Sequence, residues 1–398
     1  MISVEEALTR VFALCPAPAA ESVALRAAAG RVLVAPATAR RDQPPFAASA
    51  MDGYALAHAG LAPGARLRVV GEAAAGVAYS GRVAPGEAIR IFTGAPIPND
   101  VDTVVIQEDI TRSSDEITIN EMPAPGANIR PAGGDFRAGD SLSAPRRLRP
   151  ADLALLAAMN VPQVQVTRRP VVAFIATGDE LVMPGEAPGP DQIVASNIFG
   201  LAAMAEAEGA EARMLPIARD DAGHMAAVLS LARDADVIVT IGGASVGDHD
   251  IVAEVAGTMG LERAFYRIAM RPGKPLMAGR MGDAVMLGLP GNPVSAIVCG
   301  LLFLLPLLRA MQGLPQEGPR TLPAALGCDV PANGPRAHYM RARLAPGDET
   351  DAALPVVTPF ASQDSSLLGI LSEAAALLVR PAGDGARTAG ERVRYLPL

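Results

Sequence analysis

The sequence predicts a multidomain protein of the α/β plus β-rich class, built around a central doubly wound α/β domain. Its 398 residues exceed one ordinary hydrophobic core, which favours two to four domains. From Pro170 onward, apolar strand-like runs alternate with segments of helical periodicity, as in a parallel sheet covered by helices. On either side, short strand-like segments are interrupted by proline and glycine. We therefore expect the α/β domain over residues 170–315 and a small C-terminal β domain over 316–398.

The N-terminal part is predicted to hold two further domains. Residues 3–35 and 150–159 have helical patterns, and Ser3 with Glu6 forms the capping-box pattern that opens a helix. Between them, strand-like segments alternate with turns. We expect a β-rich domain over 42–143, inserted into a discontinuous helical and linker domain made of residues 1–41 and 144–169.

Within the α/β domain, strands and helices alternate along the chain. The expected order is a strand over 170–178, a helix over 196–209, a strand over 212–218, a helix over 220–235 capped by Asp220 or Asp221, strands over 236–243 and 284–291, and a helix over 292–311. In the last helix, Val294–Leu308 is uncharged but spans only 15 residues, fewer than the roughly 20 that cross a membrane. We expect this segment to be a buried core helix.

Composition narrows the functional classes. Half of the residues are apolar and 19% are charged, which indicates a folded globular protein, and a net charge of −8 argues against general nucleic-acid binding. The N-terminus has no export-signal pattern, and the three cysteines include no CxxC pair, as in reduced cytosolic thiols. We expect a cytoplasmic protein without a nucleic-acid or membrane partner. The four histidines are far apart, so any metal should be Mg²⁺ bound by carboxylates and substrate oxygens, not zinc.

Four polar, glycine-bearing loops are candidates for one binding site. They are TGDEL (177–181), GGASVGDHD (242–250), MRPGKP (270–275) and LPGNPVS (289–295). We expect them to gather at one edge of the sheet, where strand ends bind ligands. Glycines let backbone N–H groups approach a phosphate, and the candidates are Gly242, Gly243, Gly247, Gly273 and Gly291. Arg271 and Lys274 add positive charge, whereas the carboxylates of Glu180, Asp248 and Asp250 could hold a metal or orient a water.

Taken alone, each loop could equally be a tight turn. The chain has neither GxGxxG after the first strand nor GxxxxGK[ST], which excludes the usual nicotinamide and P-loop sites. The β-rich part adds ASAMDGYAL (48–56) and NIRPAGGDFRAGD (128–140), either of which could also be a hairpin tip. Near the C-terminus, Arg341 and Arg343 alternate on one strand, and ASQDSSLL (361–368) supplies neutral donors. An arginine with hydroxyl groups suits a tetrahedral oxyanion, although a solvated strand face would look the same.

Eight motifs follow one another along the chain: SAMDGYA, TGAPIP, NIRPAGGDFRAGD, TGDEL, GGASVGDHD, MRPGKP, LPGNPVS and SQDSSLL. With these motifs in this order, the chain is similar to the molybdopterin molybdenumtransferases, which are the MoeA proteins and the E domain of gephyrin. The resemblance covers essentially the whole chain. It implies the last step of molybdenum cofactor synthesis, in which adenylylated molybdopterin and molybdate react and AMP leaves. It also implies a homodimer of elongated four-domain subunits, with each site between the α/β domain of one subunit and the β-rich domain of the other.

The resemblance also implies roles for individual residues. The residues expected to be catalytic are Asp52, Thr93, Asp135, Glu180 and Asp250. Those expected to bind substrate are Gly242, Gly243, Ser245, Gly247, Arg267, Arg271, Lys274, Pro290, Pro293, Arg341 and Ser362. Mg²⁺ is expected on Glu180, Asp220 and Asp250. Many relatives have lysine at positions 267 and 271; arginine keeps the charge there, so oxyanion binding should survive.

Two other functions stay open at this stage. Stand-alone domains of the α/β type adenylylate molybdopterin, but this chain carries motif residues in its other domains as well. A gephyrin-like scaffold that binds a peptide is the second alternative, although no attached partner domain or long linker is visible. A molybdopterin adenylyltransferase and molybdenum enzymes are the protein partners that the resemblance implies.

Overall fold

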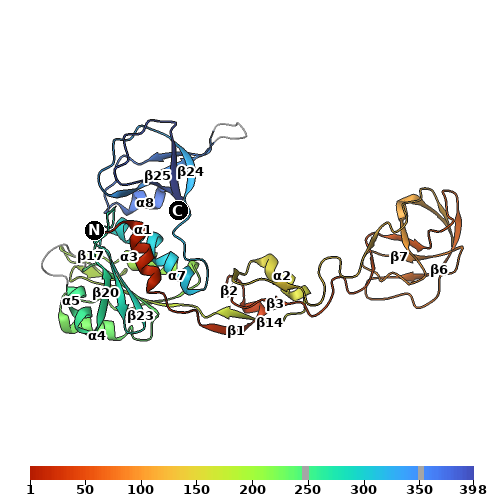
Figure 1. Ribbon diagram of the computed structural model, residues 1–398, viewed down its shortest axis with the longest axis horizontal. Helices are drawn as coiled ribbons and strands as arrows, with labels where there is room; N and C mark the ends of the chain where they lie inside the picture. Colours follow the sequence, from red (N-terminus) through yellow and green to blue (C-terminus); the bar gives the residue numbers. More distant parts are fainter. Residues whose placement is uncertain (244–250, 348–353) are drawn as a thin grey trace. The chain divides into compact units, whose positions relative to one another are not determined.

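The structure, a computed structural model, describes residues 1–243, 251–347 and 354–398 (Figure 1). The chain divides into two compact units. One is formed by Met1–Glu21 together with Thr167–Leu398, and the other by Ser22–Val166. The first unit holds the α/β domain and the C-terminal β domain, and it carries most of the candidate site residues.

The α/β domain is built on a six-stranded sheet. In spatial order its strands are β18 (Glu211–Met214), β15 (Val171–Ala176), β19 (Val237–Ile241), β23 (Ala284–Leu289), β22 (Met277–Met281) and β20 (Leu261–Phe265). The first four strands are parallel, as predicted, but β22 is antiparallel to both of its neighbours, β23 and β20. The reason is the connection between β22 and β23, where only Gly282 and Asp283 intervene, and a two-residue turn can join only antiparallel strands.

Helices cover both faces of this sheet, which confirms the doubly wound architecture. One face packs against α1 (Val4–Ala13), α3 (Asn197–Ala207) and the helix formed by α6 (Pro293–Cys299), a π-helical turn (Gly300–Leu304) and α7 (Leu305–Met311). The other packs against α4 (Ala222–Ser230) and α5 (Ile251–Thr258). Alternate residues of β15 enter the two cores: Phe174 joins the first and Ile175 the second.

The long apolar helix is a core helix, as predicted. Pro293–Met311 is long and apolar enough to span a membrane by composition, yet 78% of its most apolar stretch is buried inside the fold. Phe303, Leu307 and Leu308 are fully buried in the core beneath the sheet. The hydrophobicity of this segment is therefore accounted for by packing within the protein.

The N-terminal helix is shorter than predicted and belongs to the α/β domain. It ends at Ala13, just before two prolines, Pro16 and Pro18, and Ser3 caps it by accepting a hydrogen bond from the Glu6 N–H at 3.1 Å. Its apolar face packs against the α/β core. Residues 14–35 are not helical apart from one 3₁₀ turn (Leu25–Ala27). The helix α1 thus packs with the α/β domain and not with the discontinuous domain to which the sequence assigns it.

The unit Ser22–Val166 contains a small mixed part and a β-rich part. In the mixed part, α2 (Pro150–Ala158) accompanies the sheet β1 (Ala20–Ala24), β14 (Gln163–Thr167), β2 (Val32–Leu33) and β13 (Arg146–Arg147), with a further pair, β3 (Ala37–Thr38) and β12 (Ser141–Leu142). The β-rich part has the sheet β8 (Thr103–Ile106), β5 (Gly53–Leu56), β7 (Glu87–Ile91), β6 (Arg66–Ala73), β10 (Glu116–Ile119) and β9 (Ile110–Ser113), a 3₁₀ turn (Gln107–Asp109), and the pair β4 (Ala48–Ser49) and β11 (Ile129–Arg130). The strands between residues 42 and 143 confirm the β-rich segment.

The C-terminal domain is a small barrel. Its strands are β24 (Leu322–Leu326), β25 (Ala337–Ala345), β26 (Val356–Pro359), β27 (Ala376–Arg380) and β28 (Arg392–Pro397), and pairing of β25 with β27 closes the barrel. A short helix, α8 (Leu368–Glu373), precedes β27. One strand of the α/β region, β21 (Met270–Arg271), joins this sheet beside β25. The barrel and the α/β domain are therefore linked by backbone hydrogen bonding as well as by sequence.

Candidate functional site

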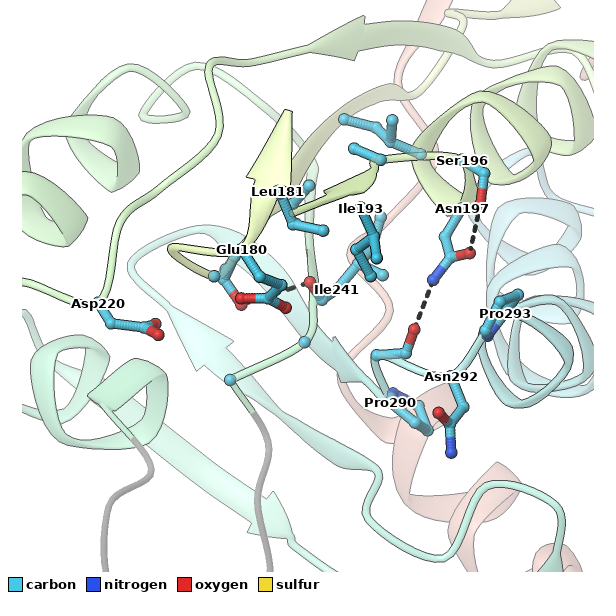
Figure 2. A pocket seen from close by; sticks show the side chains of 18 of the residues that line it. Glu180, Leu181, Ile193, Ser196, Asn197, Asp220, Ile241, Pro290, Asn292 and Pro293 are labelled. Atoms are coloured by element: carbon cyan, nitrogen blue, oxygen red, sulfur yellow. Dashed lines mark hydrogen bonds between the residues drawn. The ribbon is translucent and has the colours of Figure 1, made fainter. Parts of the chain in front are cut away.

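A pocket of about 800 Å³ lies at the carboxyl ends of three neighbouring strands of the α/β sheet (Figure 2). Its lining includes Thr177, Gly242 and Pro290, which directly follow β15, β19 and β23. In chain order, β15 is followed by β18, which lies on one side of it in the sheet, and then by β19, which lies on its other side. The pocket therefore lies at the topological switch point of the sheet, where open α/β sheets bind their ligands.

Two glycines allow the strand-end loops to meet. Gly242 has a φ of +95°, and a Cβ there would lie 2.8 Å from the Thr177 carbonyl oxygen. Gly243 has a φ of +66°, and a Cβ there would collide with the Val252 side chain. A Cβ on Gly291 would lie 3.5 Å from the Gly242 Cα. This close approach confirms that TGDEL, the start of GGASVGDHD and LPGNPVS gather at one edge; Ser245, Gly247, Asp248 and Asp250 lie outside the described residues.

The loop MRPGKP reaches the same edge by a different route. It precedes β22, and because β22 is antiparallel, its first residue, Met277, pairs with Gly288 at the end of β23. Pro275 lines the pocket, whereas Arg267, Arg271 and Lys274 are outside the pocket lining as far as the structure describes it. The Arg267 guanidinium instead lies 5.4 Å from the centre of the Tyr266 ring. The expected substrate contacts of these three cations stay a prediction.

Glu180 and Asp220 both line the pocket, and they come from two loops that are far apart in the sequence (Figure 2). Both side chains are exposed, and no hydrogen bond reaches either carboxylate from the part of the chain that the structure describes. Gly178 has a φ of +141°, and a Cβ there would collide with the Glu180 carboxylate. Position 178, two residues before Glu180, must therefore be glycine for the Glu180 side chain to keep its position.

The available oxygen donors fit Mg²⁺. Mg²⁺ sites commonly use one or two carboxylates together with substrate phosphates and waters, and do not need an all-protein cage. Among the described residues no group of three or more His, Cys, Asp or Glu side chains is placed to hold a metal. The pair Glu180 and Asp220 is thus suited to a metal shared with a ligand, while the third expected ligand, Asp250, lies outside the described residues.

The sequence interpretation missed several pocket residues. Ser196, the first residue of the helix predicted over 196–209, lines the pocket. Its hydroxyl donates to Asn197 Oδ1 at 3.3 Å and does not cap α3. The Asn197 amide donates to the Gly291 carbonyl at 2.7 Å, so it fixes the LPGNPVS loop. The signal that could have revealed them is a pair of polar residues at the end of the strand-like run Ile193–Ala195.

One wall of the pocket is apolar. Two short parallel strands, β16 (Leu181–Val182) and β17 (Ile193–Val194), form it. Ile193 remains 59% exposed, which is unusual for a large apolar side chain in a strand. Binding pockets for small molecules typically combine such apolar walls with a few polar groups.

Asp52 and Thr93 lie together in the other unit. The Thr93 N–H and hydroxyl both donate to Asp52 Oδ1, each at 2.8 Å. These two hydrogen bonds, with a smaller contribution from the charge of Arg90, hold the pKa of Asp52 below its usual value. Asp135 lies in a separate exposed loop, where its N–H donates to the Gln43 carbonyl at 2.9 Å. The structure therefore pairs Asp52 with Thr93, while the expected catalytic roles of Asp52, Thr93 and Asp135 stay a prediction.

Arg341 has a different role from the one predicted. Its side chain is 1% exposed, and its guanidinium donates to the carbonyls of Leu367, Asp364 and Ser362 at 2.9, 2.8 and 3.3 Å. These contacts organise the loop after β26 and do not present the guanidinium to an oxyanion. The strand pattern could not reveal this, because burial comes from the loop that folds over the strand.

The loop held by Arg341 contacts the pocket loop LPGNPVS. The Ser365 carbonyl accepts a hydrogen bond from the Val294 N–H, and the Ser365 hydroxyl accepts one from Asn292 Nδ2, both at 3.0 Å. Pro293, at the first turn of α6, lacks an N–H and loses nothing there. Ser362 is exposed, and its predicted contact with substrate stays a prediction.

Comparisons with known proteins agree with this architecture. Three family models match the chain: the MoeA N-terminal region (domains I and II) over residues 2–160, a probable molybdopterin binding domain over 173–310, and the MoeA C-terminal region (domain IV) over 323–398. A molybdopterin molybdenumtransferase of Nostoc sp. is 34% identical over 413 aligned residues, which cover 100% of this chain and 94% of that protein. The enzyme of that name from Haemophilus influenzae is 35% identical and covers 79% of each chain.

Solved structures show the same relationship. A crystal structure of the molybdopterin biosynthesis MoeA protein from Pyrococcus horikoshii matches with a TM-score of 0.82 and 30% identity, covering 100% of this chain and 99% of that one. A crystal structure of a molybdopterin biosynthesis MoeA protein from Pyrococcus horikoshii OT3 gives a TM-score of 0.83 at 26% identity, covering 100% of both chains. With matches that span every domain, the chain belongs to the molybdopterin molybdenumtransferase family.

Proposed function

We propose that this chain is a transferase of molybdenum cofactor biosynthesis that inserts molybdenum from molybdate into adenylylated molybdopterin and releases AMP. The observation that carries the proposal is the switch-point pocket, in which Glu180 and Asp220 face a space of about 800 Å³. This volume lies in the range of pockets that hold drug-sized or nucleotide-sized ligands. Family membership supports the proposed reaction, and the pocket supports the proposed location of the reaction.

The pocket is suited to a phosphate-linked substrate. Ser196 and Asn197 at the amino end of α3, and Asn292 and Pro293 at the amino end of α6, all line it. The amino ends of helices carry partial positive charge and favour bound phosphate. The apolar wall formed by Leu181 and Ile193 offers a surface for a ring system. These features fit a substrate that joins ring systems through a phosphoanhydride.

The carboxylates are the proposed site for Mg²⁺. Glu180 and Asp220 would hold the ion, with Asp250 as a third candidate outside the described residues. When bound, Mg²⁺ neutralises phosphate charge and so assists cleavage of a phosphoanhydride. Asp52, whose pKa is held below its usual value by the hydrogen bonds from Thr93, is assigned to the same reaction. A homodimer and a cytoplasmic location complete the proposal.

The first experiment measures AMP release from adenylylated molybdopterin by the purified protein with Mg²⁺, with and without molybdate. We expect release that depends on molybdate and that stops when Mg²⁺ is chelated. Absence of release under both conditions would contradict the proposed reaction. Transfer of AMP from ATP to metal-free molybdopterin would then favour the adenylyltransferase alternative, and tight binding of a peptide without catalysis would favour the scaffold.

A further inference from the structure

Arg219 ties together the two loops that carry Glu180 and Asp220. It lies in the turn between β18 and α4 and is not itself part of the pocket lining. Its Nη1 atom donates to three backbone carbonyls of the loop TGDEL: those of Gly178 at 3.3 Å, Asp179 at 3.0 Å and Leu181 at 3.0 Å. One guanidinium thus fixes the backbone on both sides of Glu180.

Further hydrogen bonds connect the same two loops. The Asp220 N–H donates to Asp179 Oδ1 at 3.1 Å, and the Gly178 N–H donates to the Ala218 carbonyl at 3.0 Å. The Arg219 N–H donates to His224 Nδ1 at 3.1 Å, which fixes the turn that bears the guanidinium. The backbone of each pocket carboxylate is therefore held, while its oxygens receive no hydrogen bond from the described residues.

We propose that Arg219 is a positioning residue that holds the Glu180 and Asp220 carboxylates in place to bind a divalent cation. This inference rests on the proposed function of the pocket. Two carboxylates that are to share one cation must keep a fixed separation, and flexible loops would not keep it unaided. Arginine suits this role because its planar group can meet several carbonyls at once.

The test compares Arg219→Gln and Arg219→Lys with a matched control, Arg213→Gln. Arg213 lies on β18, six residues before Arg219, and its guanidinium bonds only the exposed Glu211 and Asp234 among the described residues. Mn²⁺ binding, followed by electron paramagnetic resonance in the absence of substrate, reports on the cation site without turnover. We expect about tenfold weaker Mn²⁺ binding in Arg219→Gln, partial recovery in Arg219→Lys and no change in Arg213→Gln.

Steady-state kinetics supply a second readout. Arg219→Gln should lower kcat and raise the Mg²⁺ concentration required for half-maximal AMP release, with a smaller change in the KM for adenylylated molybdopterin. A merely structural role would lower the melting temperature and leave Mn²⁺ affinity and kcat of the folded variant unchanged, which would overturn the proposal. If Arg219→Gln does not fold, Arg219→Met, which keeps the aliphatic stem of the side chain but has no hydrogen-bond donor, supplies the test. Wild-type Mn²⁺ affinity in that folded variant would overturn the proposal equally.

The two proposals fail in distinguishable ways. Wild-type protein that releases AMP with molybdate, together with an unaffected Arg219→Gln variant, leaves the proposed function intact and removes the role of Arg219. Wild-type protein that neither binds Mn²⁺ nor releases AMP contradicts both.

Discussion

Asp52 in the β-rich domain and the pair Glu180 and Asp220 in the α/β domain are carboxylates held in opposite ways. Thr93 binds the side chain of Asp52 directly, with two hydrogen bonds to one oxygen. For Glu180 and Asp220 the hydrogen bonds go to the neighbouring backbone, through Arg219 and Asp179. Their carboxylate oxygens accept no hydrogen bond from the part of the chain that is described.

This difference in hydrogen bonding indicates two different roles for the carboxylates. A carboxylate that already accepts two hydrogen bonds is oriented and kept ionised, but part of its capacity to accept is used. Carboxylates with a fixed backbone and unused lone pairs keep that capacity for a cation. The comparison thus favours Glu180 and Asp220 as cation ligands and Asp52 as an oriented charge.

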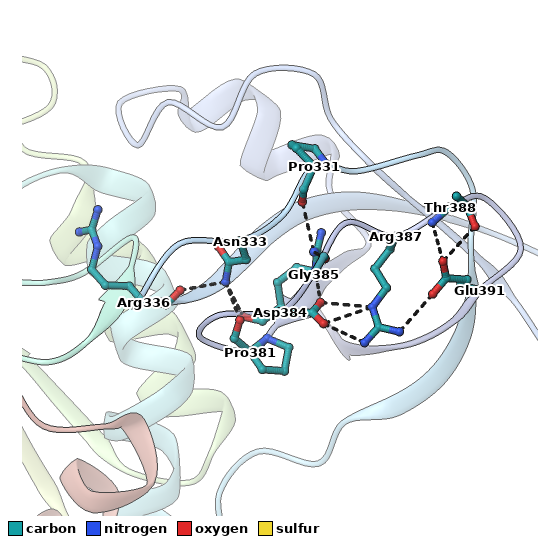
Figure 3. Close-up of polar contacts among 10 residues, drawn as sticks. Pro331, Asn333, Arg336, Pro381, Asp384, Gly385, Arg387, Thr388 and Glu391 are labelled. Carbon is teal, nitrogen blue, oxygen red and sulfur yellow. Dashed lines mark hydrogen bonds and ion pairs between the residues drawn. The ribbon is translucent and has the colours of Figure 1, made fainter.

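Asp384, in the C-terminal barrel, shows a third arrangement (Figure 3). Its side chain is 9% exposed and forms ion pairs with the buried Arg380 and with Arg387. Hydrogen bonds from Arg387, and then from Arg380, hold the pKa of Asp384 below its usual value. Arg380 also donates to the carbonyls of Pro331 and Gly385. Every partner here belongs to the barrel itself, so the network serves stability and not ligand binding.

The largest effect is expected from Glu180→Gln. This change keeps the shape of the side chain and removes its charge, so AMP release should fall roughly a thousandfold whether Glu180 holds the cation or acts on a proton. Because no hydrogen bond from the described residues reaches this carboxylate, the thermal unfolding curve should hardly change. Activity near that of the wild type would remove Glu180 from the site, and a large loss of stability would show that its charge is structural.

Asp384→Ala should have the opposite effect to Glu180→Gln, because it should lower stability and not AMP release. It leaves the buried Arg380 charge without its carboxylate, which should lower the free energy of unfolding of the barrel by about 3 kcal/mol at neutral pH. Since the Asp384 pKa is lowered on folding, its contribution is present above the unfolded pKa and is lost as pH falls through the folded one. Hydrogen exchange in β27 and β28 would report this change.

A matched control for Asp384→Ala is Glu373→Ala in the same domain. Glu373 pairs with Arg343 at 3.7 Å, and both side chains are 69% exposed, so its removal should cost less than about 1 kcal/mol. If β27 and β28 were equally protected from hydrogen exchange in both variants, the result would contradict the view that the Asp384 ion pair stabilises the barrel more strongly because Arg380 is buried.

Much of the fold could be predicted because each α/β element carries its own periodic signal. The apolar runs of β15, β19 and β23 and the helices between them are such elements. The antiparallel β22 was not foreseen, since its short segment MAGRM has no pattern that distinguishes strand direction. Nor could the position of α1 be foreseen, because an amphipathic helix shows that it needs an apolar partner but not which one.

The candidate site was predictable where residues directly follow strands. Thr177, Gly242 and Pro290 could be grouped because parallel strands share one edge. The hydrogen-bond partners of Asn197 and Arg219 could not be predicted, since they depend on which loop carbonyls lie opposite these side chains. Arg341 was misjudged for the same reason: its acceptors lie more than twenty residues further along the chain, in a loop whose fold no local pattern describes.

The smallest effect is expected from Thr93→Val, which tests how Asp52 is held. Valine keeps the size and the backbone N–H but removes the hydroxyl, so one of the two hydrogen bonds to Asp52 Oδ1 is lost and the Asp52 pKa rises toward its usual value. Activity at neutral pH should fall by about tenfold or less, because the carboxylate is still ionised but less firmly oriented.

The pH profile of Thr93→Val distinguishes this explanation from a general disturbance. A carboxylate that must be ionised loses activity as pH falls through its pKa, so the acid limb of AMP release should move to higher pH in this variant. Thr93→Ser, which retains the hydroxyl, should keep the acid limb of the wild type. Coincident acid limbs in the valine variant and the wild type would show that the hydroxyl does not set the charge of Asp52, and the contrast with Glu180 and Asp220 would then rest on geometry alone.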